Sequence, residues 1–174
     1  MMRRLMRKRC AELIRSLDLK APLRAEELCR QVAERRNRPI RLAPLAFPHG
    51  GPVGLLVSTA SVDYIFYETH TSVPHQTHII AHELGHLLWG HSSAASTDAV
   101  TPTVPESINP TLIKHMLGRT LYSHPEEFAA EYFATQVLRR TSEWTIEASS
   151  VPEDERELVE RLERSLRPGP EEHA

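Results

Sequence analysis

The stretch that decides the fold is Ile79-Ile80-Ala81-His82-Glu83-Leu84-Gly85-His86-Leu87-Leu88-Trp89. Its centre has the pattern His-Glu-x-x-His, and residues four apart on a helix lie on one face. The imidazoles of His82 and His86 can therefore reach one metal ion, with the carboxylate of Glu83 beside them. This spacing is typical of a Zn²⁺ site in which the carboxylate takes a proton from the metal-bound water. We therefore predict His82 and His86 as metal ligands and Glu83 as the catalytic base.

The residues around this pattern favour a long, buried helix. Pro74 suits the first turn, with Ser72 or Val73 near the N-cap, and no further proline occurs before Gly90. Apolar residues recur at helical spacing and predict a wide buried stripe, namely Ile79, Ile80, Leu84, Leu87 and Leu88. The alternative is a core helix whose histidines are only hydrogen-bonded. The glutamate between two histidines at ligand spacing favours the metal site.

A second helix is predicted in the stretch that begins at His124 and Pro125, and it offers the third ligand. Glu127 and Glu131 are four residues apart and share a face. Ala130 between them is small and lets this helix approach the first one closely. Glu127 can ligate the metal, while Glu131 bonds the free ring nitrogen of a ligand histidine and fixes its orientation. The alternative is a solvated acidic face at a helix N-terminus, where the dipole favours glutamate.

Together, the two stretches resemble the ImmA/IrrE family of metallopeptidases. That family pairs a His-Glu-x-x-His helix with a later Glu-x-x-Ala-(Asn/Asp)-x-Phe-Ala helix, and this chain has Glu127-Phe128-Ala129-Ala130-Glu131-Tyr132-Phe133-Ala134. The arrangement is similar to the thermolysin-like gluzincins, whose third ligand is a glutamate. The resemblance covers roughly residues 25–140. It implies zinc ligands at His82, His86 and Glu127 and a general base at Glu83. Glu131 stands where the family more often has Asn or Asp.

Composition sets the class of protein. The chain has 174 residues, a net charge of −2 and two cysteines, Cys10 and Cys29. This length suits one domain, the charge argues against a dedicated nucleic-acid binder, and two cysteines make no disulfide framework. No apolar run reaches the length of a membrane span, and Met1 to Leu19 lacks a signal-peptide core. We expect one cytoplasmic domain over residues 1–174, with a basic helical arm (1–24), a zincin-like core (25–140) and an acidic C-terminal helix (141–174).

Basic residues gather near the N-terminus, at Arg3, Arg4, Arg7, Lys8 and Arg9 and again at Arg35, Arg36 and Arg38. Two interpretations are open for the N-terminal group. It is a solvated helix face that faces an acidic C-terminal helix, or it is a docking site for an acidic partner or nucleic acid. We favour the solvated face, because no aromatic residues are interleaved with these charges.

The segment before the metal helix predicts a small antiparallel sheet, so the expected fold class is α+β and mostly helical. Strand-like stretches run over 40–47, 53–59 and 62–68. Ala60-Ser61 lie between the last two, which makes a hairpin plausible. The free edge of such a sheet can pair with an extended peptide substrate, and we expect the strand over 62–68 to be that edge.

Downstream, residues 92–110 lack an apolar period and predict a long loop, either a lid or an insertion without a role. Helices are expected at Asn109–Gly118 and Val151–Leu166. An oxyanion donor is also expected, with three candidates between the ligand segments: Tyr122, His115 and His124. His78 shares a face with His82 and can bond within the site. His91 is interpreted as a helix-end histidine rotated away from the ligand pair.

The expected function is a zinc-dependent endopeptidase that hydrolyses a peptide bond in a protein partner. The resemblance implies a helix-turn-helix transcriptional repressor as that partner. The alternative is a non-proteolytic, metal-stabilised module that binds a regulator or toxin partner. The presence of Glu83 favours the peptidase, since a purely structural site has no use for a general base.

Overall fold

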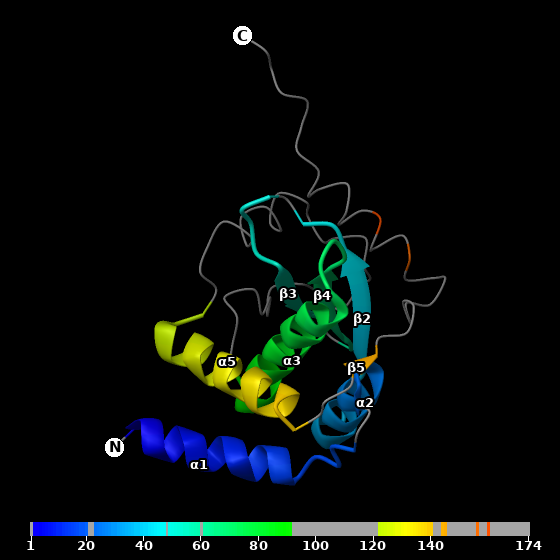
Figure 1. Ribbon diagram of the computed structural model, residues 1–174. Coiled ribbons are helices and arrows are strands. Elements are labelled where there is room, and N and C mark those ends of the chain that lie inside the picture. The colour runs from blue at the N-terminus through cyan, green and yellow to red at the C-terminus, as the bar shows by residue number, and fades with distance from the viewer. Residues whose placement is uncertain are drawn as a thin grey trace.

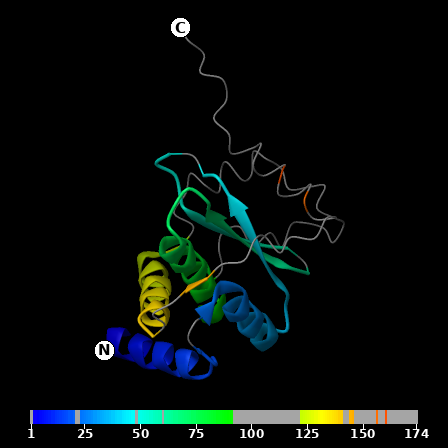
Figure 2. The same cartoon turned by 45° about the vertical axis from the view of Figure 1, so that its right-hand side comes forward.

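A computed structural model describes residues 2–20, 23–47, 49–59, 61–91, 122–140, 144–145, 156 and 160. Within this part of the chain the fold is α+β, with a small three-stranded sheet. The helices are α1 (Met2–Arg15), α2 (Ala25–Arg36), α3 (Val73–Trp89) and α5 (His124–Leu138). The strands of the sheet are β2 (Ile40–Leu45), β3 (Gly54–Ser58) and β4 (Asp63–Glu68). Helix α3 packs between the sheet and α5, and α1 lies against α5 (Figures 1 and 2).

Strand β4 is central, which corrects the expectation that residues 62–68 form the free edge. The strand order is β2-β4-β3, with β2 parallel and β3 antiparallel to β4. The sheet is therefore mixed, and the expected all-antiparallel arrangement is wrong. The physical reason lies in the run Tyr64–Tyr67, whose residues are all buried. A strand that is apolar on both faces belongs inside a sheet. The predicted β3–β4 hairpin is confirmed.

Strand β3 presents a row of main-chain groups at the edge of the sheet. The N–H of Glu68 donates to the carbonyl oxygen of Val53 at 2.9 Å, and antiparallel hydrogen bonds alternate along a strand. The N–H and C=O groups of Gly54, Leu56 and Ser58 therefore face away from β4. Among the described residues no further strand pairs with that side.

The core forms around α3. Its predicted apolar stripe is buried at Ile79, Ile80, Leu84 and Leu87. Side chains from α1, α2, α5 and the sheet join the same cluster, including Ile14, Leu28, Val32, Ile65, Phe133 and Val137. Burying one such side chain contributes roughly 1.5–3 kcal/mol relative to leaving it exposed. This packing holds α3 against its neighbours along its length.

The basic start of the chain is engaged within the fold. The guanidinium carbons of Arg3, Arg7 and Arg9 lie 5.3, 5.6 and 4.8 Å from the ring centroids of Phe128, Tyr132 and Trp89. Such cation–π contacts contribute about 0.5–1 kcal/mol each at exposed sites. These three arginines therefore help dock α1 onto α5 and the end of α3, in addition to facing solvent.

A buried ion-pair cluster fixes the C-terminal end of α3. Asp63 is fully buried, and its two carboxylate oxygens lie 2.9 Å from Arg38 Nε and 3.5 Å from Arg36 Nη2. Arg36 also donates to the carbonyl oxygen of Leu87 at 2.7 Å. Because a buried carboxylate is costly without such partners, the cluster ties α2, β4 and α3 together. Two of the three arginines in the second basic group, Arg36 and Arg38, thus stabilise the fold.

Two short strands, β1 (Leu23–Arg24) and β5 (Trp144–Thr145), pair in parallel. They were not predicted, because two residues carry no periodic pattern. None of the described helices has the combination of length and apolar character that crossing a lipid bilayer requires. The predicted loop over 92–110 and the helix at Asn109–Gly118 lie outside the described residues, as does Val151–Leu166 apart from Arg156 and Glu160.

Candidate metal centre

Helix α3 presents the two histidines from one face. It begins as predicted, with Ser72 at the N-cap and a proline in the first turn, and it ends at Gly90. His82 and His86 are one turn apart, and their Nε2 atoms lie 3.1 Å from each other. His86 is fully buried, whereas His82 is partly exposed. The two imidazoles therefore converge on one point at the margin of the core.

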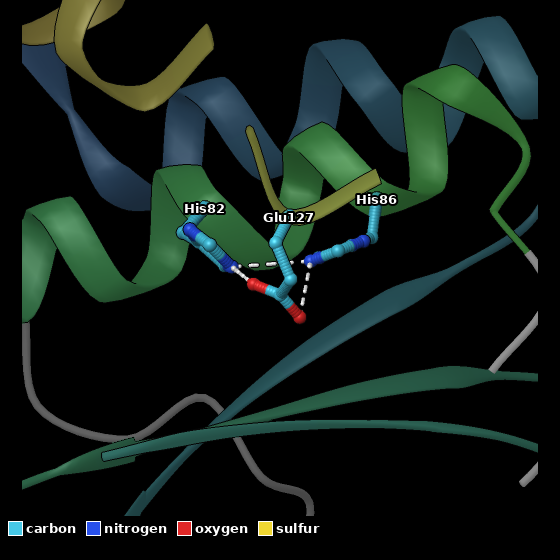
Figure 3. A group of neighbouring side chains, drawn as sticks. All are labelled: His82, His86 and Glu127. Atoms are coloured by element: carbon cyan, nitrogen blue, oxygen red, sulfur yellow. Dashed lines mark hydrogen bonds and ion pairs between the residues drawn. The ribbon is translucent and has the colours of Figure 1, made fainter. Parts of the chain in front are cut away.

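Glu127 of α5 completes the cluster. One carboxylate oxygen lies 3.2 Å from His82 Nε2 and the other 3.9 Å from His86 Nε2. Figure 3 shows the three side chains pointing toward one another from two helices. Donors 2.0–2.1 Å from a tetrahedral Zn²⁺ are about 3.3 Å apart, so these separations fit a shared cation. The group formed by His82, His86 and Glu127 can hold a metal ion.

The two glutamates at the start of α5 have separate roles. Glu126 accepts hydrogen bonds at 2.8 Å from the backbone N–H and from the hydroxyl of Ser123. This places it in a capping box, which satisfies groups at the helix N-terminus. Glu127 instead turns toward the imidazoles. The alternative of a merely solvated acidic face therefore does not describe Glu127, whose contacts are the two histidines.

A close contact between helices brings Glu127 within reach of α3. A Cβ atom built on Gly85 would lie 3.0 Å from the Cα and 3.2 Å from the carbonyl oxygen of Ala130. The backbones of α3 and α5 thus touch at this pair, as expected from the small residue on the second helix. Gly85 fills one of the free positions of the His-Glu-x-x-His pattern. Gly85 therefore helps to bring Glu127 to the two histidines, through packing rather than through a side chain.

Glu83 is buried beside the cluster. A Cβ atom on Gly54 would lie 2.7 Å from one Glu83 carboxylate oxygen, so the missing side chain of Gly54 leaves room for this carboxylate. Burial, and next the charge of Glu127, raise the pKa of Glu83 to about 8. In the metal-free protein the carboxyl therefore keeps its proton near neutral pH. A cation between the three ligands would favour the ionised form.

The electrostatics of the cluster suit a cation with nitrogen and oxygen donors. Burial, followed by the neighbouring charges of His82 and His91, lowers the pKa of His86 to about 3, which keeps a neutral lone pair available. No Lys or Arg of the described residues forms an ion pair with Glu83 or Glu127. Two imidazoles and a carboxylate are a donor set typical of catalytic zinc.

Glu131 lies behind His82. Its Oε2 atom is 3.4 Å from His82 Nδ1 and 2.9 Å from His78 Nε2. Burial opposes ionisation of Glu131, but the His78 hydrogen bond and the charges of both imidazoles outweigh it and lower the pKa. Glu131 thus contacts the ring nitrogen of His82 that faces away from the cluster. His78 bonds to Glu131 and stays outside the ligand group.

Of the three candidate oxyanion donors, Tyr122 lies against the cluster and His124 does not join it. The buried ring of Tyr122 stacks on His86, with centroids 3.5 Å apart and planes 14° from parallel. His124 is the exposed first residue of α5 and does not join the ligand group. His115 lies outside the described residues. Tyr122 therefore restrains the plane of the His86 imidazole, and its role as an oxyanion donor stays a prediction.

His91 belongs to the site, and the interpretation that it is rotated away is wrong. Its Nδ1 atom lies 2.9 Å from Nδ1 of His86. A continuing helix would carry His91 round to another face, but Gly90 adopts a left-handed conformation (φ 69°) that ends the helix. The N–H of His91 then donates to the carbonyl oxygen of His86 at 3.0 Å. The glycine after the last apolar residue was the available signal.

Comparisons of the chain with protein-family models, with curated protein sequences and with solved structures give no match. The geometry of the His–Glu cluster is therefore the basis for assigning a function.

Proposed function

We propose that this chain is a zinc-dependent endopeptidase with a zincin-like core, as the resemblance to the ImmA/IrrE family implies. The observation that carries the proposal is the buried Glu83 carboxyl beside a ligand group drawn from two helices. A structural metal site has no use for a proton acceptor. A Zn²⁺ ion held by the group would lower the pKa of its water to about 7 and polarise a peptide carbonyl.

The role of Glu83 in this reaction is to move a proton. Its carboxylate accepts a proton as the nucleophile attacks and returns it to the leaving amine. Gly54 leaves room for this carboxylate, because a Cβ atom at that position would lie 2.7 Å from Glu83 Oε1. Because Glu83 is buried, its affinity for a proton is high, and it rises further with the nearby charge of Glu127. A base of this kind is matched to work near neutral pH.

The edge of β3 is the proposed support for the substrate, in place of the strand first expected. Main-chain groups of Gly54, Leu56 and Ser58 face this edge, as the hydrogen bond between Glu68 and Val53 implies. An extended peptide can add to such an edge through main-chain hydrogen bonds. Because Gly54 touches Glu83, the scissile bond would lie near the Gly54 end of the strand.

The proposed substrate is a protein, and the resemblance points to a helix-turn-helix repressor. The test uses purified protein stripped of metal by a chelator and restored with one equivalent of Zn²⁺. Cleavage of an unfolded protein, such as denatured casein, and of a co-expressed repressor is followed by mass spectrometry. Zinc-dependent cleavage of either one is expected. Tight zinc binding with no cleavage of any substrate would favour the non-proteolytic interaction module.

Replacing Gly54 with alanine should impair catalysis but not metal binding. The new Cβ atom would lie 2.6 Å from Ile79 Cγ2 and 2.7 Å from Glu83 Oε1, so the carboxylate must shift. Misplacing a catalytic group by about 1 Å can reduce the rate on the order of 10²-fold. Turnover and zinc affinity are measured in parallel, with Ser61→Ala, an exposed residue between β3 and β4, as control. An unchanged kcat in Gly54→Ala would show that the position of the Glu83 carboxylate does not depend on the space at Gly54.

A further inference from the structure

The two proposed ligand imidazoles are supported by different kinds of partner. The remote nitrogen of His82 faces a carboxylate oxygen of Glu131 at 3.4 Å. The remote nitrogen of His86 faces another imidazole, with Nδ1 of His86 and Nδ1 of His91 separated by 2.9 Å. The His86 and His91 rings meet edge to face, at 65°. Carboxylates, backbone carbonyls and water are the usual partners of ligand histidines, so the imidazole partner is distinctive.

If His86 binds a metal, this fixes which ring nitrogens of His86 and His91 carry hydrogen. Two bare ring nitrogens cannot share a hydrogen bond, so one of the two Nδ1 atoms carries the hydrogen. If His86 offers the lone pair of Nε2 to a cation, its own hydrogen resides on Nδ1. His86 then donates to Nδ1 of His91, and His91 carries its hydrogen on Nε2. This single arrangement satisfies both the hydrogen bond and a metal at Nε2.

The surrounding elements hold His91 in place for this contact. Gly90 turns the chain, and the backbone N–H of His91 is fixed to the carbonyl oxygen of His86. The His91 ring lies parallel to Trp89, with centroids 6.2 Å apart, and it also meets Tyr122. Arg9 covers the Trp89 ring from α1. The acceptor is therefore restrained by backbone and side-chain contacts before any metal binds.

We propose that His91 is a positioning residue that accepts a hydrogen bond from His86 and aims the other nitrogen of His86 at the metal. The proposal rests on the proposed metal site and assigns its support to a residue beyond the three ligands. His91 acts through His86 and is not itself a ligand, because its Nδ1 faces the remote side of the ligand ring. The stacked Tyr122 restrains the plane of the same ring, while His91 fixes its rotation and tautomer.

The test compares two variants of His91. His91→Phe keeps an aromatic ring beside Trp89 and Tyr122 but removes the acceptor. His91→Asn places an amide oxygen near the position of the lost Nδ1 and restores an acceptor. Zinc affinity is measured by competition with a chelator, and the control is His75→Phe, an exposed histidine on the same helix. We expect a roughly 10- to 100-fold weaker affinity in His91→Phe and recovery to within a few-fold in His91→Asn.

Thermal unfolding of the metal-free proteins separates positioning from a general role in folding. The metal-free His91→Phe variant should melt near the wild-type temperature. Wild-type zinc affinity in His91→Phe, or an equal loss in both His91 variants, would overturn the positioning role. If the expected affinities are found but the wild-type protein cleaves nothing, the peptidase proposal fails and the positioning role stands. If the wild-type protein binds no zinc, both fail.

Discussion

Replacing Glu83 with glutamine is expected to abolish peptide cleavage while zinc binding persists. The amide has nearly the shape of the carboxyl and fits the space beside Gly54, but it cannot accept a proton at the reacting centre. Loss of a general base typically costs about 10²–10⁴-fold in rate. The measurement is kcat/KM on any substrate cleaved by the wild-type protein, together with zinc affinity from chelator competition.

The matched control for this variant is Glu12→Gln, an exposed glutamate on α1. It carries the same chemical change far from the cluster and should retain full activity. Cleavage by Glu83→Gln at the wild-type rate would remove Glu83 from the mechanism. Loss of zinc from that variant would instead show that the buried carboxyl contributes to the metal site.

The Glu83→Gln variant should also differ from the wild type in how its stability depends on pH when the metal is absent. The pKa of Glu83 is about 8 in the folded protein and near the ordinary value of 4.5 in the unfolded chain. Its contribution to stability is thus fully present below pH 4.5 and is lost as pH rises toward 8. The free energy of unfolding should change by at most about 1.4 kcal/mol per pH unit from this group. Relative to wild type, the glutamine variant should therefore gain stability over this interval, measured by urea unfolding with a chelator present.

Replacing Glu127 with alanine is expected to cause the largest loss of zinc affinity among changes outside α3. It removes the only donor that α5 offers to the described ligand group. The loss should exceed the 10- to 100-fold typical of removing an outer hydrogen-bond partner. Because Glu127 is partly exposed and its charge opposes ionisation of Glu83, the metal-free protein should not lose stability. Isothermal titration with Zn²⁺ and thermal unfolding of the metal-free form provide the two measurements.

The adjacent glutamate gives a sharp control for this experiment. Glu126→Ala removes the capping box at Ser123 and should cost about 1 kcal/mol of stability with zinc affinity unchanged. The two neighbouring variants are therefore expected to show opposite patterns. Full zinc retention in Glu127→Ala would reassign the third ligand. Equal effects of both variants would mean that α5 supports zinc binding only by stabilising the fold.

The helices and the ligand group were predictable because their determinants are local. Pro74 and Gly90 bound α3, and the i, i+4 spacing places His82 and His86 on one face. The two stretches are far apart in sequence, but their chemical complementarity predicted that Glu127 would join the histidines. The order of the strands depends on long-range pairing. The hairpin joins β3 to β4 but does not determine which of these two strands β2 pairs with. Even so, the unbroken apolar run of β4 was evidence for a central strand.

Other parts of the site could not be predicted because their determinants are not side chains at a regular spacing. Gly54 matters through the space that it leaves for Glu83. His91 reaches His86 only because the chain reverses at Gly90, and a helical projection has no meaning beyond that point. Periodicity arguments therefore hold within an element and fail at its first left-handed residue.

The contact of Gly85 with Ala130 has a consequence for how the chain can be engineered. The distance between the imidazoles and Glu127 is therefore set where two helices touch. His91 and Tyr122, which precede and follow residues 92–121, both contact His86. A reporter group inserted between residues 91 and 122 would therefore begin and end beside the candidate metal-binding residues.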